Sequence, residues 1–536
     1  MTATDKEATT LLAGHIDDDA VSLNVGVLVF GGATVSLRSV SIEEGTLPDA
    51  NIKPSPLTDR GLANLTAFAL MYGQAKYFHP SDAAFKADWS RLAADGVQRV
   101  ESCPDAPALA AALADTFAEV GVGIQVWAGD DAPAVPPAPA AETRVTGWRH
   151  LGVNFGPEFS TGNTQTPYKS QRIKEQAADG EARKLPKSGA FATGSAAGVS
   201  WRIPVVLAVN DRGATEPAAA TPKPIAARAE GFRPSGNDRV TRLADVIAAW
   251  NVFEHFYPYF DVTPDADWKA TLASSLKAAA TDADQAAFLS TLRKLVADLR
   301  DGHGNVFKAD LRPQKGLPCG WRILASGDLV VTSGEGPDGL HAGDKVVSVD
   351  AQPAAELIER QRSLASGATP QWRNWVAARN LLGYAPTTDP SVVVVERAGV
   401  PQTLHIPLVS AEKFATNDPQ RPATGAVVGR VDGKDNGEIV YFNLDGAKSD
   451  EVDNQIERLH KAAGIVFDLR GYPNDAATIV LRHLTDEPIQ MPSGSSRWSP
   501  CPAAKRAAVG SGRNAADGIC RRWSRVSAAR RSRWCF

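Results

Sequence analysis

The sequence predicts a multidomain α/β protein made of a repeated helical unit, a β-rich module and a partial βαβ unit. Three observations support this prediction: similar helical patterns at 57–130 and 236–310, a change to short strands at 314–412, and a strand–helix–strand pattern within 425–491. A chain of 536 residues is also too long for a single hydrophobic core. We therefore expect several domains, each with its own core.

The composition is that of an ordinary globular protein. Hydrophobic residues make up 43% of the chain and charged residues 22%, and the net charge of −4 argues against nucleic acid or an anionic membrane as a required partner. No apolar run is long enough to span a membrane, and no signal peptide is visible, so the compartment is unknown and cytoplasmic by default. The five cysteines fit neither a zinc site nor a disulfide framework, and no metal or organic cofactor is predicted.

Two segments next to the helical units have a different character. Apolar residues alternate within 20–45, which predicts a β-rich N-terminal remnant at 1–50. Residues 131–235 contain two Pro- and Ala-rich stretches, interpreted as linkers, and a β-rich segment with a strand near 201–209.

The helical unit is predicted to occur twice. Four apolar positions recur at an offset of 178 residues, and each copy continues with an aromatic–proline segment and then Ala-Asp-Trp. Apolar residues on one face predict a helix at the start and at the end of each copy, and Asp284 is expected to cap the last helix. We interpret the recurring aromatic residues as core. The matching positions are Leu65, Phe68, Tyr72 and Phe78, and then Leu243, Val246, Trp250 and Phe256.

The two copies differ at the turn that ends each of them. Both turns contain Gly-x-Gly, but only the second carries an imidazole, His303, with Asp301 two residues earlier. Histidine has a proton affinity suited to base chemistry near neutral pH. His303 is therefore a candidate general base with Asp301 as its orienting acid. The alternative is that His303 bonds nearby carbonyls and Asp301 caps the turn.

Residues 314–412 are predicted to form short strands separated by turns. The run Gly339-Leu340-His341-Ala342-Gly343-Asp344 is followed by alternating valines, and this pattern closely resembles the turn and strand of a PDZ domain. The resemblance implies a module that binds a peptide C-terminus by adding it as a strand. It makes Gly339, Leu340, Gly343 and Asp344 candidate peptide-binding residues.

The segment 425–491 predicts a partial α/β unit. A strand at 437–444, a helix at 450–463 and a buried strand at 464–471 form a parallel βαβ pattern. The last strand ends in Asp468-Leu469-Arg470-Gly471, whose acidic and basic side chains are expected to form a structural ion pair.

The order of these features resembles the tail-specific (C-terminal-processing) serine peptidase family, and the histidine points to its tricorn-like branch. The resemblance covers about 236–491. It implies cleavage of peptides or unfolded proteins through an acyl-enzyme, with His303 as the base for a serine and Gly471 in the oxyanion region. The loop after Gly471 departs from the family pattern because it lacks further glycines and contains Pro473.

The segment 492–536 does not resemble the rest of the chain. It carries ten basic residues and one acidic residue, a charge of +9, whereas the other residues comprise 47 basic and 60 acidic residues, a charge of −13. A basic nucleic-acid-binding tail is one explanation. Three Trp and three Cys, with no Leu or Tyr, favour translation in a shifted reading frame. On that interpretation the segment that carries the nucleophilic serine is absent.

The sequence therefore predicts a serine-type peptidase by family with little or no activity as encoded, since losing the rest of a catalytic unit lowers the rate about a millionfold. The alternative is a non-catalytic protein that binds C-terminal peptides through its PDZ-like module. A third hypothesis is a gene fragment that never accumulates as a folded protein.

Overall fold

The computed structural model is a mixed α/β structure, with ten helices and five sheets among the residues that it describes. None of these helices is both long enough and apolar enough to cross a membrane. The predicted remnant at 1–50, apart from Ser39 and Ser41, and the tail 492–536 lie outside the described residues. The described residues are 39, 41, 53–137, 143–153, 168–176, 191–216, 234–257, 259–260, 267–308, 311–334, 339–410, 422–445, 447–469 and 480.

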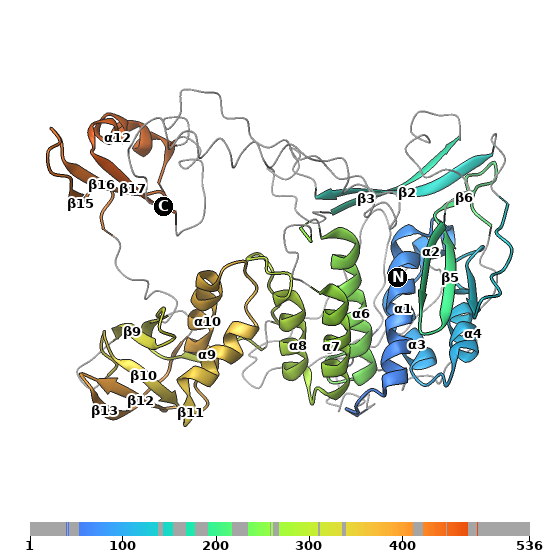
Figure 1. Ribbon diagram of the computed structural model, residues 1–536, viewed down its shortest axis with the longest axis horizontal. Coiled ribbons are helices and arrows are strands. Elements are labelled where there is room, and N and C mark those ends of the chain that lie inside the picture. Colours follow the sequence, from blue (N-terminus) through green and yellow to red (C-terminus); the bar gives the residue numbers. More distant parts are fainter. Residues whose placement is uncertain are drawn as a thin grey trace.

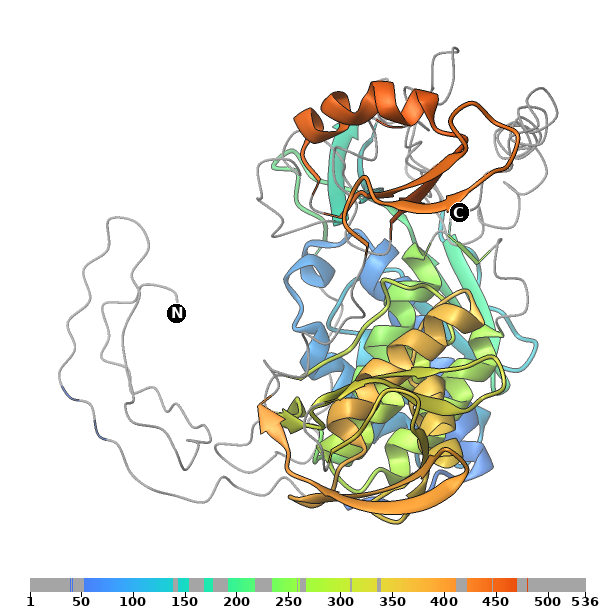
Figure 2. The same ribbon diagram turned by 90° about the vertical axis from the view of Figure 1, so that its left-hand side faces the viewer.

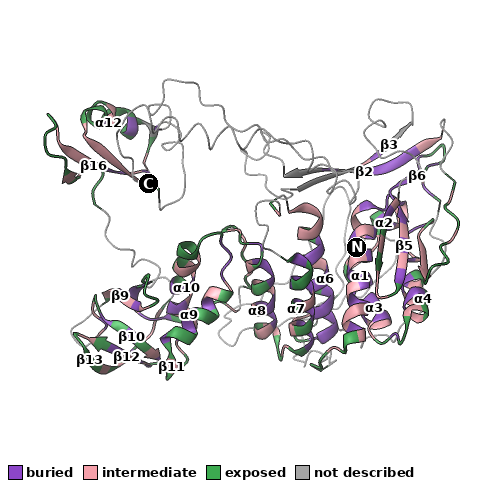
Figure 3. Ribbon diagram, viewed as in Figure 1, coloured by how far each residue is buried: buried purple, intermediate pink, exposed green. Residues whose placement is uncertain are grey.

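Buried residues form three hydrophobic cores in the described part of the chain. Figure 3 marks the buried residues along the ribbon in purple. The first joins helices and strands between Leu65 and Leu299. The second lies between Leu317 and Ile406, and the third is a small cluster that includes Val440 and Phe442. The boundaries between domains remain predictions from the sequence.

The first helical copy contains four helices, each preceded by a residue whose side chain accepts a hydrogen bond from the first turn. This capping satisfies backbone N–H groups that a helix leaves without internal partners. The helices are α1 (Asp59–Phe78), α2 (Asp82–Lys86), α3 (Trp89–Val100) and α4 (Ala106–Phe117), capped by Thr58, Ser81, Asp88 and Asp105.

The second copy contains the helices α6 (Arg239–Phe256), α7 (Trp268–Thr281) and α8 (Gln285–Ala297). The predicted cap of α8 is confirmed, because the Asp284 carboxylate accepts hydrogen bonds from two backbone N–H groups at the start of the helix. Asp267 caps α7 just as Asp88 caps α3. This similarity supports the repeat, which itself remains a prediction.

Helices α1 and α6 pack side by side at the centre of the helical part (Figure 1). At their ends the ring centroids of Tyr77 and Phe256 are 4.7 Å apart, and those of Phe78 and His255 are 5.2 Å apart. Tyr77 aligns with His255 in the sequence repeat, and Phe78 aligns with Phe256. The two contacts therefore interchange between the copies, as expected for similar units paired about a local two-fold axis.

Two antiparallel three-stranded sheets accompany these helices. One has the order β1-β5-β4 and the other β3-β2-β6. The single strand expected near 201–209 is two strands in different sheets, because the chain bends at Val205 after Pro204, and proline cannot donate to a ladder. The strands are β1 (Gln125–Ala128), β2 (Arg144–Val153), β3 (Tyr168–Gln176), β4 (Phe191–Ala196), β5 (Val199–Pro204) and β6 (Val206–Ala208).

The predicted β-rich module contains an antiparallel sheet of order β13-β12-β10-β9-β8, with the short β11 on β10. Two helices, α9 (Ala354–Ser363) and α10 (Pro370–Tyr384), accompany it, and α10 packs against β8. Short strands β7 (Lys315–Gly316) and β14 (Val409–Ser410) pair with each other. The sheet strands are β8 (Cys319–Ile323), β9 (Leu329–Gly334), β10 (Lys345–Val349), β11 (Gln352–Pro353), β12 (Ser391–Arg397) and β13 (Val400–Ile406).

The last described unit is a three-stranded sheet and one helix. Strands β16 (Glu438–Asn443) and β17 (Gly464–Asp468) pair in parallel around helix α12 (Ser449–Lys461), which confirms the predicted βαβ pattern. Strand β15 (Val427–Arg430) adds an antiparallel edge. Figure 2 shows α12 lying over this sheet, and Figures 1 and 2 both place the unit away from the β8–β13 sheet.

Candidate functional site

The turn that follows helix α8 carries the predicted imidazole–carboxylate pair. The Nδ1 atom of His303 lies 3.2 Å from the Oδ1 atom of Asp301, and the same oxygen accepts a 2.9 Å hydrogen bond from the backbone N–H of His303. The His303 side chain is fully exposed to solvent, whereas that of Asp301 is 26% exposed. Asp301 therefore both caps the turn and contacts the ring, so the two roles considered for it coexist.

Two side chains, those of Ser366 and Tyr257, hold the turn that contains Asp301. Its backbone N–H donates a 3.1 Å hydrogen bond to the hydroxyl of Ser366, which in turn donates to the carbonyl of Val296 at the end of α8. The hydroxyl of Tyr257 donates to the Leu299 carbonyl at 3.1 Å. Burial, together with the neighbouring carboxylate of Asp301, raises the pKa of Tyr257 to about 12. These contacts tie the turn to helix α6 and to the loop before α10.

The geometry of the pair leaves one ring nitrogen available for chemistry. If Nδ1 of His303 donates its proton to the carboxylate of Asp301, Nε2 is the basic nitrogen. A serine-peptidase histidine uses its nitrogens in this way, with Nδ1–H on the acid and Nε2 facing the serine hydroxyl. The exposed ring can therefore accept a proton from a hydroxyl or water brought to it.

The first helical copy also contains a serine next to a histidine, but both are buried. The Nδ1 atom of His79 lies 3.1 Å from the hydroxyl of Ser81, and its Nε2 atom lies 3.1 Å from the carbonyl of Val122. The Ser81 hydroxyl also donates to the Val120 carbonyl and caps α2 by accepting from Ala84. Burial lowers the pKa of His79 to about 4. These residues fasten the turn after α4 and are inaccessible to substrate.

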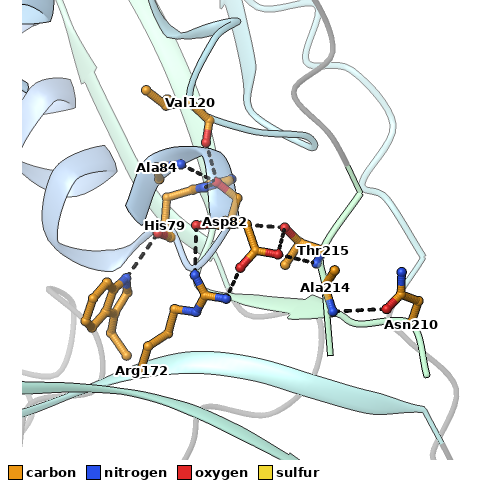
Figure 4. Close-up of polar contacts among 10 residues, drawn as sticks. His79, Asp82, Ala84, Val120, Arg172, Asn210, Ala214 and Thr215 are labelled. Carbon is orange, nitrogen blue, oxygen red and sulfur yellow. Dashed lines mark hydrogen bonds and ion pairs between the residues drawn. The ribbon is translucent and has the colours of Figure 1, made fainter. Parts of the chain in front are cut away.

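An acidic residue beside this pair does not complete a triad. Figure 4 shows the carboxylate of Asp82 turned toward the guanidinium of Arg172 on β3 and toward Thr215. The backbone N–H of Thr215 donates to Asp82 at 2.9 Å, and the Thr215 hydroxyl accepts from the Asp82 backbone N–H, also at 2.9 Å. The cluster joins α2 to the β3-β2-β6 sheet and the segment after it, so its role is structural.

Hydrogen bonds within the module hold the predicted peptide-binding turn in place. The carboxylate of Asp344 accepts two hydrogen bonds from Arg397, at 2.8 and 2.7 Å, and one from the backbone N–H of His341. The hydrogen bonds from Arg397 hold the pKa of Asp344 below its usual range. Arg397 also donates to the Gly339 carbonyl at 2.8 Å.

The other two residues of this turn have conformational and packing functions. Gly343 has φ +96°, a conformation that favours glycine. Leu340 is buried in the core of the module. These contacts account for the turn structurally, and binding of a peptide by these four residues remains a prediction.

The C-terminal end of the predicted site is only partly described. Gly471 and Arg470 lie outside the described residues, so neither the oxyanion region nor the expected ion pair can be placed. Asp468 is buried and accepts a 2.5 Å hydrogen bond from the hydroxyl of Tyr441 on β16. Within the described part of the chain, no group of three or more His, Cys, Asp or Glu residues is placed to hold a metal ion.

The structure brings His303 and Asp301 together and adds residues that sequence reasoning missed. Tyr257 and Ser366 support the turn, and the indole of Trp372 lies against Gly302. The sequence held a signal for Tyr257, because it precedes a proline at the same place in its copy as His79. It held none for Ser366 and Trp372, which come from the following module.

No protein-family model matches the chain, and neither does any curated protein. Among solved structures, mature CPAF in complex with lactacystin matches with a TM-score of 0.32 and 12% identity, over 42% of this chain and 55% of that one. Mature CPAF matches with the same TM-score and 13% identity, over 42% and 54%. CPAF is a chlamydial serine protease of the tail-specific type. The chain thus spans about half the length of these structures, and likenesses this weak assign it no function.

Proposed function

We propose that this chain is a serine-type peptidase relative of the tail-specific, tricorn-like type, with His303 as general base and Asp301 as the residue that orients it. The observation that carries the proposal is the 3.2 Å contact between His303 Nδ1 and Asp301 Oδ1 on an exposed turn. With the proton of the ring on Nδ1, this contact leaves Nε2 as the basic nitrogen, as base catalysis of serine attack requires. Peptides or unfolded proteins are the proposed substrates.

The order of elements along the chain supports the same proposal. The helical unit that we propose is repeated ends in the His303 turn, the module that we propose is PDZ-like follows it, and a parallel βαβ unit carries Asp468 at its strand end. The caps and the paired aromatic contacts of the two helical copies support the repeat. Gly471 is the proposed start of the oxyanion region.

We also propose that the chain by itself hydrolyses peptides slowly or not at all. Among the described residues, the His303 ring has one hydrogen-bond partner, the carboxylate of Asp301, and no serine hydroxyl contacts it. A base without a nucleophile retains only a small part of the rate of a complete catalytic unit.

A fluorophosphonate probe tests whether an activated serine is present. We expect negligible labelling of the purified full chain and negligible cleavage of an unfolded protein. Labelling that His303→Ala abolishes would support the peptidase assignment and contradict the low activity. Labelling that survives His303→Ala would contradict the role of His303.

The base itself is tested with an activated ester, whose hydrolysis needs an imidazole but no serine. His303→Ala and Asp301→Ala should each lower the rate of p-nitrophenyl acetate hydrolysis. The matched control is His405→Ala, which removes an exposed imidazole on β13. Equal losses from His303→Ala and His405→Ala would mean that His303 has no special basicity, and the proposal would fail.

The alternative is a non-catalytic protein that binds C-terminal peptides. One observation favours it: strand β13 lies at the end of its sheet in the described part of the chain and pairs with β12 along all seven of its residues. An edge strand can accept a peptide as an additional strand. Binding that depends on a free peptide carboxylate, without turnover, would support this alternative.

A further inference from the structure

Two tryptophans on helix α10 form an exposed aromatic surface next to the His303 turn. The rings of Trp372 and Trp375 are stacked, with centroids 5.1 Å apart and planes inclined by 30°. Trp372 is 41% exposed and Trp375 is 49% exposed, so both indoles retain a large face toward solvent. Tryptophan is among the residue types that are enriched at the energetic hot spots of binding interfaces.

The position of Trp372 is fixed by the turn itself. Its indole N–H donates a 3.1 Å hydrogen bond to the carbonyl of Ser366, the residue whose hydroxyl also holds Asp301. A Cβ atom added at Gly302 would lie 3.3 Å from the indole, and one added at Gly367 would overlap it. The aromatic surface and the His303 turn therefore form one continuous structure.

The surface also carries a positive charge. The guanidinium of Arg379 lies over the ring of Trp375, 5.5 Å from its centroid. Helix α10 contains a second arginine, Arg373, and no acidic residue. An arginine stacked on an indole keeps N–H donors free to bind a carboxylate while its plane contacts the ring. The charge favours an occupant that combines an apolar side chain with a carboxylate.

We propose that Trp372, Trp375 and Arg379 form a docking surface for an extended peptide that carries an aromatic or long aliphatic side chain next to an acidic group. The claim that this peptide is the substrate of His303 rests on the proposed function. Gly302 touches Trp372 and is adjacent to His303 in the chain. Since an extended peptide advances about 3.3 Å per residue, a side chain on the tryptophans places neighbouring peptide bonds near the imidazole.

The test measures binding of a short fluorescent peptide to the full chain by anisotropy at low ionic strength. The peptide contains one Phe followed by Asp, and two comparison peptides replace the Phe by Ser or the Asp by Lys. Trp375→Ala should raise the Kd at least about tenfold. Arg379→Glu should raise it severalfold and reduce its salt dependence, because one ion pair is lost. Both comparison peptides should bind more weakly.

Phe85→Ala, which removes another exposed aromatic ring, should leave the Kd unchanged. Trp372→Ala is a second variant and should also weaken binding. If this substitution disrupts the turn, Trp375→Ala alone carries the test, because Trp375 is the more exposed ring. Unchanged binding in Trp375→Ala and Arg379→Glu, equal binding of the Ser peptide, or no binding of any peptide would each overturn the proposal. If the wild-type chain binds none of the peptides but still hydrolyses the ester in a His303-dependent way, only the docking surface is rejected. Tryptophan-dependent binding without that hydrolysis rejects only the peptidase function.

Discussion

Oδ1 of Asp301 accepts hydrogen bonds from both the backbone N–H and the ring Nδ1 of His303, at 2.9 and 3.2 Å. One carboxylate oxygen thus holds the backbone of the turn and contacts the ring, and an ionised carboxylate there favours the tautomer with the proton on Nδ1. Ser366 and Tyr257 hold the turn in which this carboxylate lies, so the orientation of the imidazole depends on residues from three parts of the chain.

The first prediction concerns the tautomer of His303. Asp301→Ala removes the acceptor for Nδ1–H, so the fraction of the Nδ1–H tautomer should fall and the Nε2–H form should predominate. Ring nitrogen shifts in ¹⁵N NMR spectra of the neutral imidazole report this change. His405 is the internal control and should not shift. An unchanged His303 signal would mean that the contact with Asp301 does not form in solution.

The second prediction is a pH dependence from Asp350. Partial burial raises its pKa, but hydrogen bonds from the backbone N–H groups of Thr387 and Val392 and from Thr388 outweigh burial and hold it at about 2. A pKa lowered by folding contributes stability above pH ~4 that is lost as the pH falls through ~2. Asp350→Asn should therefore destabilise the module by about 1–2 kcal/mol at pH 7, after allowance for solvent screening.

The measurement for Asp350 is urea unfolding of the wild type and Asp350→Asn at pH 7 and at pH 2.5. The difference in the free energy of unfolding should shrink at the lower pH, because the wild-type carboxylate becomes partly protonated. A difference independent of pH would contradict the assigned pKa.

The third prediction concerns the contact between α1 and α6. A Cβ atom at Gly73 would overlap the side chain of Asn251, which donates a 2.8 Å hydrogen bond to the carbonyl of Ala69. Gly73→Ala should therefore destabilise the helical part by about 1–3 kcal/mol. At Gly61, also on α1, the nearest atom would be 3.1 Å away, so Gly61→Ala should change stability by less than about 1 kcal/mol. Chemical denaturation followed by circular dichroism gives the free energy of unfolding of both variants. Equal losses of stability would refute the close approach of the two helices at Gly73.

The fourth prediction concerns an ion pair between the two helical copies. Arg239, whose side chain is 4% exposed, donates to both carboxylate oxygens of Glu101 at 2.8 and 2.7 Å. Glu101→Ala leaves a buried charge without its partner and should destabilise the protein by about 3 kcal/mol. The control is Glu119→Ala, which breaks the more exposed pair with Arg91 and should change stability by less than about 1 kcal/mol. Thermal unfolding of both variants measures the ranking. A smaller fall in melting temperature for Glu101→Ala than for Glu119→Ala would disprove it.

Local patterns predicted much of the secondary structure. The Asp284 cap, the strands β8, β9, β10 and β12 and the parallel βαβ pattern were visible in short windows, because capping and alternation depend on neighbours in the chain. Strand β13 and the helices α9 and α10, which lie in the segment predicted to form only short strands, were missed. The boundary between β5 and β6 was missed, since one apolar run supplied strands to two different sheets.

The sequence alone determined that an imidazole and a carboxylate share the turn at 301–303, because their separation in the chain already limits them to a short distance. Only the tertiary structure decided what surrounds them: Tyr257 at the end of α6, and Ser366 and Trp372 from the module that follows. It also showed that the Ser81–His79 pair is buried and structural. Contacts between residues far apart in the chain depend on how helices and sheets pack, and one sequence holds no local signal for that packing.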